Sequence, residues 1–183
     1  MLTFHKSACN IKKNIFHSME LPMQKFMKED DFIVSKTDTK GLITYGNEIF
    51  IHMSGYTESE LLHAPHNILR HKDMPAIVFK LLWERLKERK AINAYVKNRC
   101  KNGDFYWVFA NVTPSFDAKG EVIGYYSVRR KPKESALKVI EGIYESLLQV
   151  EKTAGMNASR ELLETTLQNN KVTYDEFIIN LQK

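Results

Sequence analysis

Three stretches with the two-residue alternation of β-strands constrain this chain most, because they follow one another without an intervening helix. They span residues 92–100, 105–115 and 122–130. The dipeptide Asn102-Gly103 separates the first two and predicts a type I′ turn, since both residue types tolerate positive φ. A second turn signal ends at Gly120. The pattern therefore predicts a three-stranded antiparallel meander.

The preceding residues predict the rest of one domain. Residues 32–37 and 42–45 are typical of two more strands joined by a turn. Helices are expected at 47–53 and 57–62, the second begun by a capping box between Thr57 and Glu60. A longer helix at 76–88 carries an inward apolar stripe: Val78, Phe79, Leu82, Trp83 and Leu86. The order predicts an α+β domain, an antiparallel sheet with short helices over one face.

The two ends of the chain have different patterns. In residues 1–30, pairs such as Met23 and Met27 have helical spacing, as do Ile15 and Met19, which predicts a partly helical segment. A disordered tail is the alternative for the first ten or so residues. Residues 133–183 show no strand signal. Their 3.5-residue apolar period predicts a helical extension, interrupted at Gly155. We therefore expect an N-terminal segment at 1–30, an α+β domain at 31–132 and the extension at 133–183.

Composition narrows the function. The net charge of +5 is spread along the chain, so it does not indicate nucleic-acid binding. The two cysteines are far apart, which predicts neither a zinc module nor a disulfide framework and favours the cytoplasm. No uncharged apolar stretch approaches the ~18 residues of a membrane span, so we expect no direct membrane insertion. Because nucleophile elbow, phosphate loop and H-E-x-x-H motif are all missing, we expect no enzyme.

The densest polar cluster is the run 66–73, with two histidines, an arginine and an aspartate. Three interpretations compete. Arg70 and Asp73 form a structural ion pair with His71 as a donor at the helix start, or Arg70 donates a forked pair of hydrogen bonds to an anionic cofactor. In the third, His66 or His71 ligates the iron of haem b.

Asn98 is polar on a strand face that is otherwise apolar. It alternates in step with Ile92, Ala94 and Val96, which should face the interior. A buried amide needs hydrogen-bond partners. These are either neighbouring backbone groups or a heterocycle such as a flavin. Aromatic surface nearby comes from Trp83, Trp107 and Phe109, for each of which core packing is the alternative role.

Several motifs together resemble the PAS domain of bacterial aerotaxis receptors. The resemblance covers about residues 31–130, and its most specific part is the His-Asn-x-x-Arg-His-x-Asp-Met-Pro run at 66–75. It implies a PAS fold, in which a five-stranded sheet cups FAD against the helices as a redox reporter. By matching position, it implies that cofactor-pocket residues or their supports are Asn47, Arg70, His71, Asp73 and Trp83. Ile92 departs from the pattern, because that family commonly has tryptophan there.

The resemblance also implies partners. The chain looks like the stand-alone PAS partner of a bipartite energy-taxis receptor, whose separate membrane-bound, methyl-accepting-type transducer carries the signalling domain. The terminal helices would contact that transducer or a second copy in a homodimer. Two alternatives remain open: a cofactor-free PAS adaptor and a haem-binding gas sensor.

Overall fold

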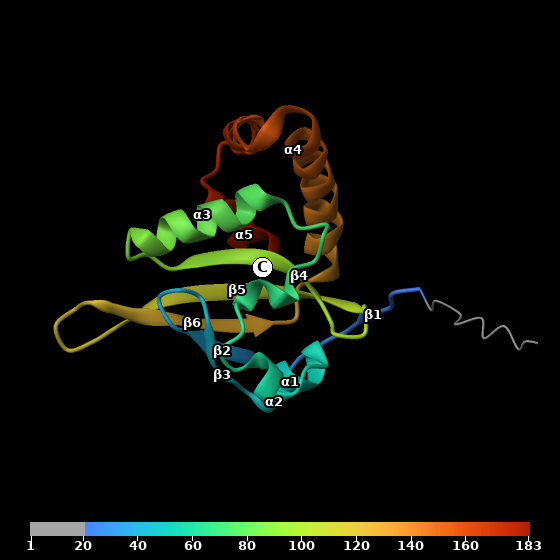
Figure 1. Cartoon of the computed structure of the whole chain (residues 1–183). Coiled ribbons are helices and arrows are strands. Elements are labelled where there is room, and N and C mark those ends of the chain that lie inside the picture. The colour runs from blue at the N-terminus through green and yellow to red at the C-terminus, as the bar shows by residue number, and fades with distance from the viewer. Residues whose placement is uncertain (1–20) are drawn as a thin grey trace, which may run out of the picture.

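The computed structural model describes residues 21–183, and a curved, six-stranded sheet forms its centre (Figure 1). Five strands pair antiparallel, as the sequence predicts, and their order in the sheet is β4-β5-β6-β2-β3. The strands are β1 (Gln24–Lys25), β2 (Ile33–Thr37), β3 (Ile43–Gly46), β4 (Ile92–Arg99), β5 (Phe105–Phe116) and β6 (Val122–Arg130).

The sixth strand corrects the prediction for the N-terminal segment. The Met23–Met27 spacing is not helical in the structure. Instead β1 pairs parallel with the start of β5, with Gln24 opposite Phe105. The sheet is thus mixed rather than wholly antiparallel. The Ile15–Met19 pair lies outside the described residues.

The hairpin turns explain how the meander closes. Cys100 accepts a hydrogen bond from Gly103 N and donates its own N–H to Asp104 O. Gly103 has a φ of 98°, whereas Asn102 is not among the residues with positive φ. This is a type I turn followed by a left-handed glycine, so the type I′ prediction is wrong although the hairpin is right.

The same three-residue turn joins β2 to β3 and β5 to β6. Gly41 and Gly120 are its left-handed glycines there, with φ of 82° and 80°. In each turn the carboxylate of the first aspartate, Asp38 or Asp117, accepts backbone N–H groups of the loop.

The short helices follow β3 and precede β4 in the chain. Asn47 caps α1, which ends at left-handed Gly55, and the predicted capping box of Thr57 and Glu60 opens α2. These helices and η1 cover a core of buried residues on the concave face of the sheet, including Phe50 and Val108. The elements are α1 (Glu48–Ser54), α2 (Glu58–Leu61), the 3₁₀ helix η1 (His66–Leu69) and α3 (Ala76–Lys87).

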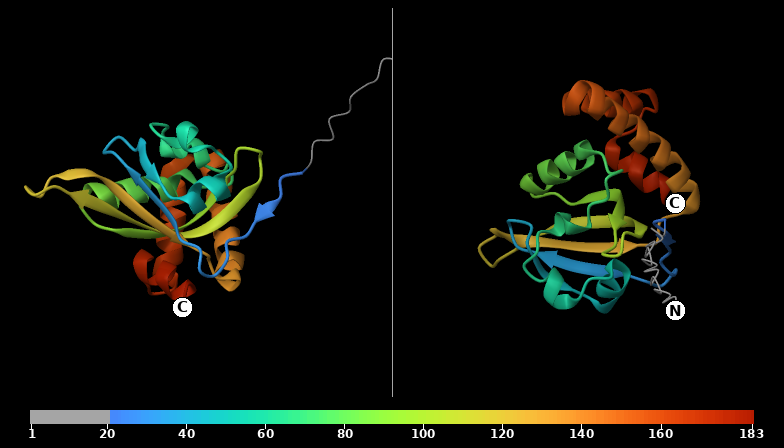
Figure 2. Two further views of the ribbon diagram at one scale, coloured as in Figure 1. Left: turned by 90° about the horizontal axis from the view of Figure 1, so that it is seen from below. Right: turned by 45° about the vertical axis from the view of Figure 1, so that its right-hand side comes forward.

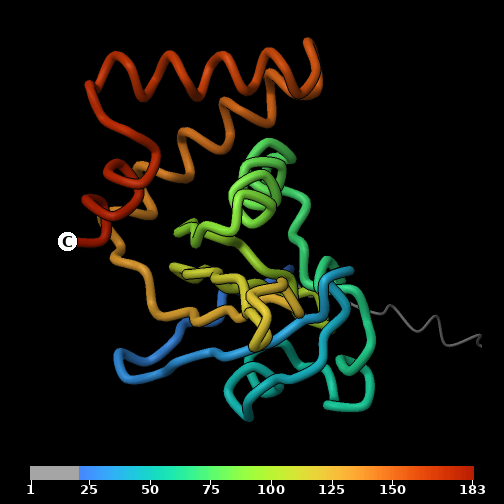
Figure 3. The backbone as a smooth tube through the Cα atoms, turned by 90° about the vertical axis from the view of Figure 1, so that its left-hand side faces the viewer, coloured from blue at the N-terminus to red at the C-terminus, as the bar shows by residue number. Residues whose placement is uncertain are grey.

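The C-terminal extension folds back onto the domain. It consists of α4 (Glu134–Asn169) and α5 (Tyr174–Leu181). Gly155 has non-helical angles and kinks α4 sharply, and the two halves meet at this bend in Figure 3. The predicted cap of Thr173 and Glu176 opens α5.

A second core lies under this extension. It joins Tyr95, Trp107 and Phe109 of the sheet to Ile140 and Tyr144 of α4. Because alternate residues of a strand point to opposite faces, these sheet residues face away from the concave side. Figure 2 shows α1 and α2 on one side of the sheet and the end of the chain on the other. The short helices thus cover one face of the sheet, as expected, and the C-terminal extension packs on the other.

Three polar contacts fix α3 to the extension. The carboxylate of Glu151 accepts the N–H groups of Ala76 and Ile77 at 2.8 Å each. Arg160 holds Glu84 with two bonds of 2.6 Å, and Arg85 pairs with Asp175. Within residues 21–183, no helix has the length and apolar character that a bilayer crossing requires.

Candidate functional site

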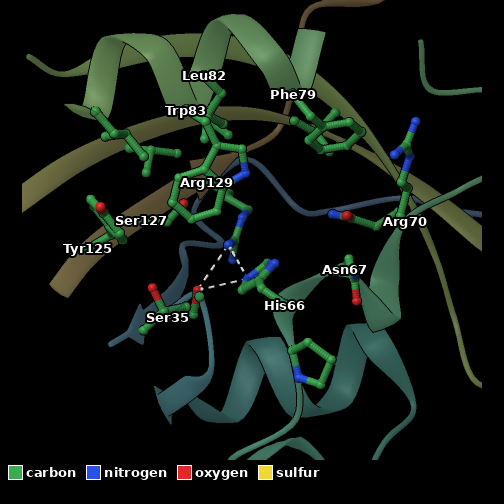
Figure 4. Close-up of a pocket in the computed structure, with 18 of the residues that line it drawn as sticks. Ser35, His66, Asn67, Arg70, Phe79, Leu82, Trp83, Tyr125, Ser127 and Arg129 are labelled. Carbon is green, nitrogen blue, oxygen red and sulfur yellow. Dashed lines mark hydrogen bonds between the residues drawn. The ribbon is translucent and has the colours of Figure 1, made fainter. Parts of the chain in front are cut away.

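A cavity of about 290 Å³ lies between the concave face of the sheet and the helices η1 and α3 (Figure 4). Four strands form one wall, and the turn at Gly41 contributes to the rim. The opposite wall consists of η1 residues and the α3 side chains Phe79, Leu82, Trp83 and Leu86. The site is therefore a pocket of the type in which small ligands bind, largely apolar with a few directed polar groups.

A buried polar cluster occupies the sheet side of this cavity. Arg129 of β6 is 5% exposed, and its Nη2 donates to Ser35 Oγ at 2.9 Å. The same nitrogen lies 2.7 Å from Nε2 of His66 in η1. Figure 4 shows the three side chains converging. Segments far apart in sequence thus meet at one point of the cavity wall.

Electrostatics fix the protonation of this cluster. Burial, followed by the charge of Arg129, lowers the pKa of His66 to about 3, so its imidazole is neutral and Nε2 accepts. Burial also lowers the pKa of Arg129 to about 10, which leaves the guanidinium charged at neutral pH. The cluster therefore presents one net positive charge to the cavity.

That charge has no carboxylate partner within the described residues. Arg129 forms no ion pair there, and its Nη1 has no hydrogen-bond partner. Two further buried groups that line the cavity, Ser127 Oγ and Asn98 Nδ2, also have none. The lining contains Lys40, Arg70 and Arg129 but neither aspartate nor glutamate. The residues of the wall thus carry donors and positive charge without a balancing carboxylate, which suits a ligand with acceptor groups better than a cation.

Arg70 stands at the cavity, as expected, but it does not pair with Asp73. Its Nη2 donates to Met74 O at 3.1 Å, and its guanidinium lies 4.6 Å from the Phe79 ring centroid. The residue itself is exposed, which leaves the other nitrogens accessible from solvent. The ion-pair interpretation of the 66–73 run is therefore wrong, and Arg70 remains available to a ligand.

Asn98 and Trp83 also lie at the cavity. Asn98 is 4% exposed on the concave face, where the strand alternation predicts it. Trp83 lines the cavity with its ring edge-on to Tyr125 at 5.3 Å between centroids. Ile92 is fully buried and does not line the cavity, so Trp83 is the tryptophan of this site.

Asn47, His71 and Asp73 do not line the cavity. Asn47 is a structural clamp: its Oδ1 accepts from Val34 N and Phe50 N, and its Nδ2 donates to Phe32 O. A direct cofactor contact would compete with these bonds, so its place is that of a support.

His71 and Asp73 instead lie beside Lys97. Asp73 pairs with the Lys97 ammonium at 2.7 Å. Burial alone would raise the pKa of Asp73, but Lys97 outweighs it and the net pKa is lowered. Burial lowers the pKa of His71, and Lys97 adds to this, so the ring is neutral; its Nδ1 accepts from Asp73 N at 3.1 Å. His71 is thus an acceptor within its loop, not the donor at the helix start that one interpretation assigned to it.

Trp107 and Phe109 do not contribute to the cavity. They pair with Lys97 and Tyr95 in the β4–β5 ladder, whereas Asn98 pairs with Tyr106. Since paired residues share a face, both aromatic rings lie on the opposite face, against α4. Their expected proximity to the site is therefore wrong, and their alternative role in core packing is confirmed.

His66, Ser35 and Arg129 form the polar group that the interpretation of the sequence missed. His66 was considered only as an iron ligand, and the other two were not considered. The signal for Arg129 was present, since it follows Tyr125 and Ser127 at two-residue steps along one strand face. The missing information was the register that places this face opposite His66.

The chain is similar in sequence to several known proteins. The PAS fold family matches residues 43–129. The aerotaxis receptor of Escherichia coli (strain K12) is 40% identical over 121 residues, which cover 66% of this chain and 24% of that protein. The nitrogen fixation regulatory protein of Klebsiella pneumoniae is 28% identical over 97 residues, 53% of this chain and 20% of that protein. The chain thus spans a fifth to a quarter of these relatives.

Solved structures agree on the fold. A light-oxygen-voltage domain studied with a flavin analogue superimposes with a TM-score of 0.54 at 22% identity, covering 63% of this chain and 86% of that one. The dark structure of the Aureochrome1 LOV photoreceptor gives 0.53 at 18% identity, covering 61% and 81%. The expected α+β PAS fold and the resemblance to an aerotaxis receptor are confirmed. Residues 43–129 of this chain belong to the PAS fold family.

Proposed function

We propose that this chain is a redox sensor for energy taxis, which binds FAD in its PAS cavity and signals by protein contact rather than as an enzyme. One observation carries the proposal: the cavity combines apolar rings with buried donors that have no protein acceptor. Its volume of about 290 Å³ is close to the lower end of the ~300–1,000 Å³ range of ligand pockets.

The residues present fit a flavin. A flavin ring is flat, with apolar faces and carbonyl acceptors along one edge. Phe79 and Trp83 supply ring surface on the helix side, and Asn98 and Arg129 supply donors on the sheet side. Arg70 at the cavity suits a diphosphate because guanidinium groups bind phosphate in forked pairs. When bound, FAD supplies reversible electron transfer and so changes the charge inside the cavity.

The relatives support this assignment. One is an aerotaxis receptor, and one structural neighbour is a light-oxygen-voltage domain studied with a flavin analogue. The partner would be a membrane-bound transducer of the methyl-accepting type, which this chain would contact from the cytoplasm. A second copy of the chain would be a further partner.

The signal has a physical path through α3. One face of this helix lines the cavity, and its N-terminus is held by Glu151 of the extension. A ligand that contacts Phe79 and Trp83 differently in two charge states would shift α3 and, with it, the helices joined to it. The transducer would then bind the exposed surface of α4 and α5 and respond to its displacement.

Haem binding has less support. Nε2 of His66 is already engaged by Arg129 at 2.7 Å, and His71 does not line the cavity. A cofactor-free adaptor would leave the three buried donors of the cavity without partners, at about 1–3 kcal/mol each if no water reached them. Both alternatives therefore conflict with the geometry of the cavity.

An absorption spectrum of freshly purified protein, followed by titration with FAD, tests the proposal. We expect flavin bands in the blue and near-ultraviolet, or their appearance on reconstitution. Arg70→Ala should weaken FAD binding about tenfold, through the loss of a charged hydrogen bond, while the fold remains intact. Arg99→Ala is the control, because this exposed arginine at the end of β4 forms no hydrogen bond or ion pair with its side chain within residues 21–183. A Soret band, or failure to bind FAD at all, would overturn the proposal.

A further inference from the structure

Arg129 is the feature of the cavity that protein stability does not explain. An arginine is rarely buried without an anionic or fully hydrogen-bonded partner, because desolvation of its charge is unfavourable. Here the residue is 5% exposed, Nη1 has no partner within the described residues, and the partners of Nη2 are the neutral His66 and Ser35. Without a ligand, the residue destabilises the cavity wall.

We propose that Arg129 is the specificity-determining residue of the cavity and donates to the carbonyl edge of the bound flavin ring, not to its phosphates. This rests on the proposed function and assigns a role within that site. The guanidinium exchanges an unsatisfied position for a charged hydrogen bond when the ligand enters. The protein thus retains a buried charge that only the ligand satisfies.

Position decides between ring and phosphate. Arg129 projects from the sheet, in the second-last position of β6, and its guanidinium lies 5.5 Å from the centroid of the fully buried Phe50 ring. The other two cations of the lining, Lys40 and Arg70, are exposed residues. A ligand with a phosphate tail keeps its charged end near solvent and its ring inside. Arg129 therefore meets the ring.

Neighbouring donors reinforce the preference. Ser127 lies two residues before Arg129 on the same strand face, and Asn98 lies on β4, with Oγ and Nδ2 unpaired respectively. Ser127 and Arg129, on one face of β6, offer two donors to the carbonyl groups along the dione edge of an isoalloxazine, and Asn98 adds a donor from β4. A phosphate would be satisfied equally well at the exposed cations.

The test uses Arg129→Met, which removes the charge but keeps much of the volume. Ser35 Oγ already lies 3.2 Å from His66 Nε2 and can donate to it once the guanidinium is absent. Arg130→Met, at the exposed neighbour on the opposite face, is the matched control. Arg129→Gln is the second variant, since it keeps a donor for His66 if the methionine variant fails to fold.

Two measurements on the full chain follow. The first is urea unfolding of flavin-free protein, where we expect the Arg129 variants to be at least as stable as wild type. The second is titration with riboflavin and with FAD, followed by flavin fluorescence. Loss of a charged hydrogen bond should weaken both ligands by the same factor, ~10- to 100-fold, with no change for Arg130→Met.

The outcomes separate the ideas. Wild-type protein that binds neither flavin overturns the proposed function, and this inference with it. If wild type binds both and the Arg129 variants bind them equally well, only this inference fails. Loss of FAD binding with unchanged riboflavin binding would assign Arg129 to phosphate instead. A large drop in the stability of both flavin-free variants would make Arg129 a structural residue.

Discussion

The bond from Glu151 to α3 offers the sharpest test of how the extension is attached. α3 follows Pro75, which gives no side-chain cap, and its first turn carries no acidic residue. Glu151 fills that place from α4, with one carboxylate oxygen on each of two backbone N–H groups at 2.8 Å. Glu151→Ala therefore removes a helix cap supplied from 74 and 75 residues away.

The magnitude follows from two contributions. Loss of a capping acceptor costs about 1 kcal/mol, within a range of 0.5–2, and loss of the negative charge at a helix N-terminus about 0.3–1. The expected total is about 1–3 kcal/mol. At roughly 3 °C per kcal/mol for a chain of this length, Tm should fall by about 3–9 °C. Glu151→Gln keeps one acceptor oxygen and should lose about half as much.

Thermal unfolding by circular dichroism measures the loss, and hydrogen exchange locates it. The amides at the start of α3 should exchange faster in Glu151→Ala, whereas those of β5 should change only with global stability. Glu145→Ala, at an exposed position of the same helix, is the control. Equal destabilisation by the control, or unchanged exchange at Ala76 and Ile77, would refute the reasoning.

Two further predictions follow from the structure. The folded state keeps His66 neutral to a pKa of about 3, while the unfolded chain takes up a proton near pH 6.5; stability is therefore complete above pH 6.5 and lost as pH falls. His66 alone should contribute about 1.5 kcal/mol of loss between pH 6.5 and 5, seen in urea unfolding as a shallower pH slope for His66→Gln; an identical slope would contradict it. Gly124→Ala would place its Cβ 2.2 Å from Thr37 O and should destabilise the β2–β6 pair strongly, whereas Gly142→Ala, with open space around it, should stabilise α4 by about 0.5–1 kcal/mol. Equal unfolding midpoints for the two alanine variants would show that the contact is absent.

Local rules predicted what depends on near neighbours. The capping boxes at Thr57 and Thr173, the helix end at Gly55 and the position of Asn98 on the concave face all follow from spacings of two to four residues. The helical interpretation of Met23–Met27 failed because β1 is formed by pairing with β5, which lies about 80 residues away.

Long-range register decided the rest of the site. Asn98 and Trp107 belong to neighbouring strands, yet a one-residue difference in pairing puts them on opposite faces. The group of Ser35, His66 and Arg129 spans 94 residues and arises only when η1 and two strands assemble. The use of the extension's apolar seam within the chain, with Ile140 and Leu147 buried, also needed the three-dimensional structure.

α3 is a partition shared by two compartments, one that can hold a ligand and one filled by the C-terminal helices. If a ligand stabilises one position of α3, the same free energy stabilises one packing arrangement of α4 and α5 against it. Because this coupling is reciprocal, a protein that binds the C-terminal helices would change the affinity of the cavity for its ligand. The ligand would change the affinity of the helices for that protein by the same factor. Ligand binding in the cavity and protein binding to the C-terminal helices thus shift one and the same conformational equilibrium of α3.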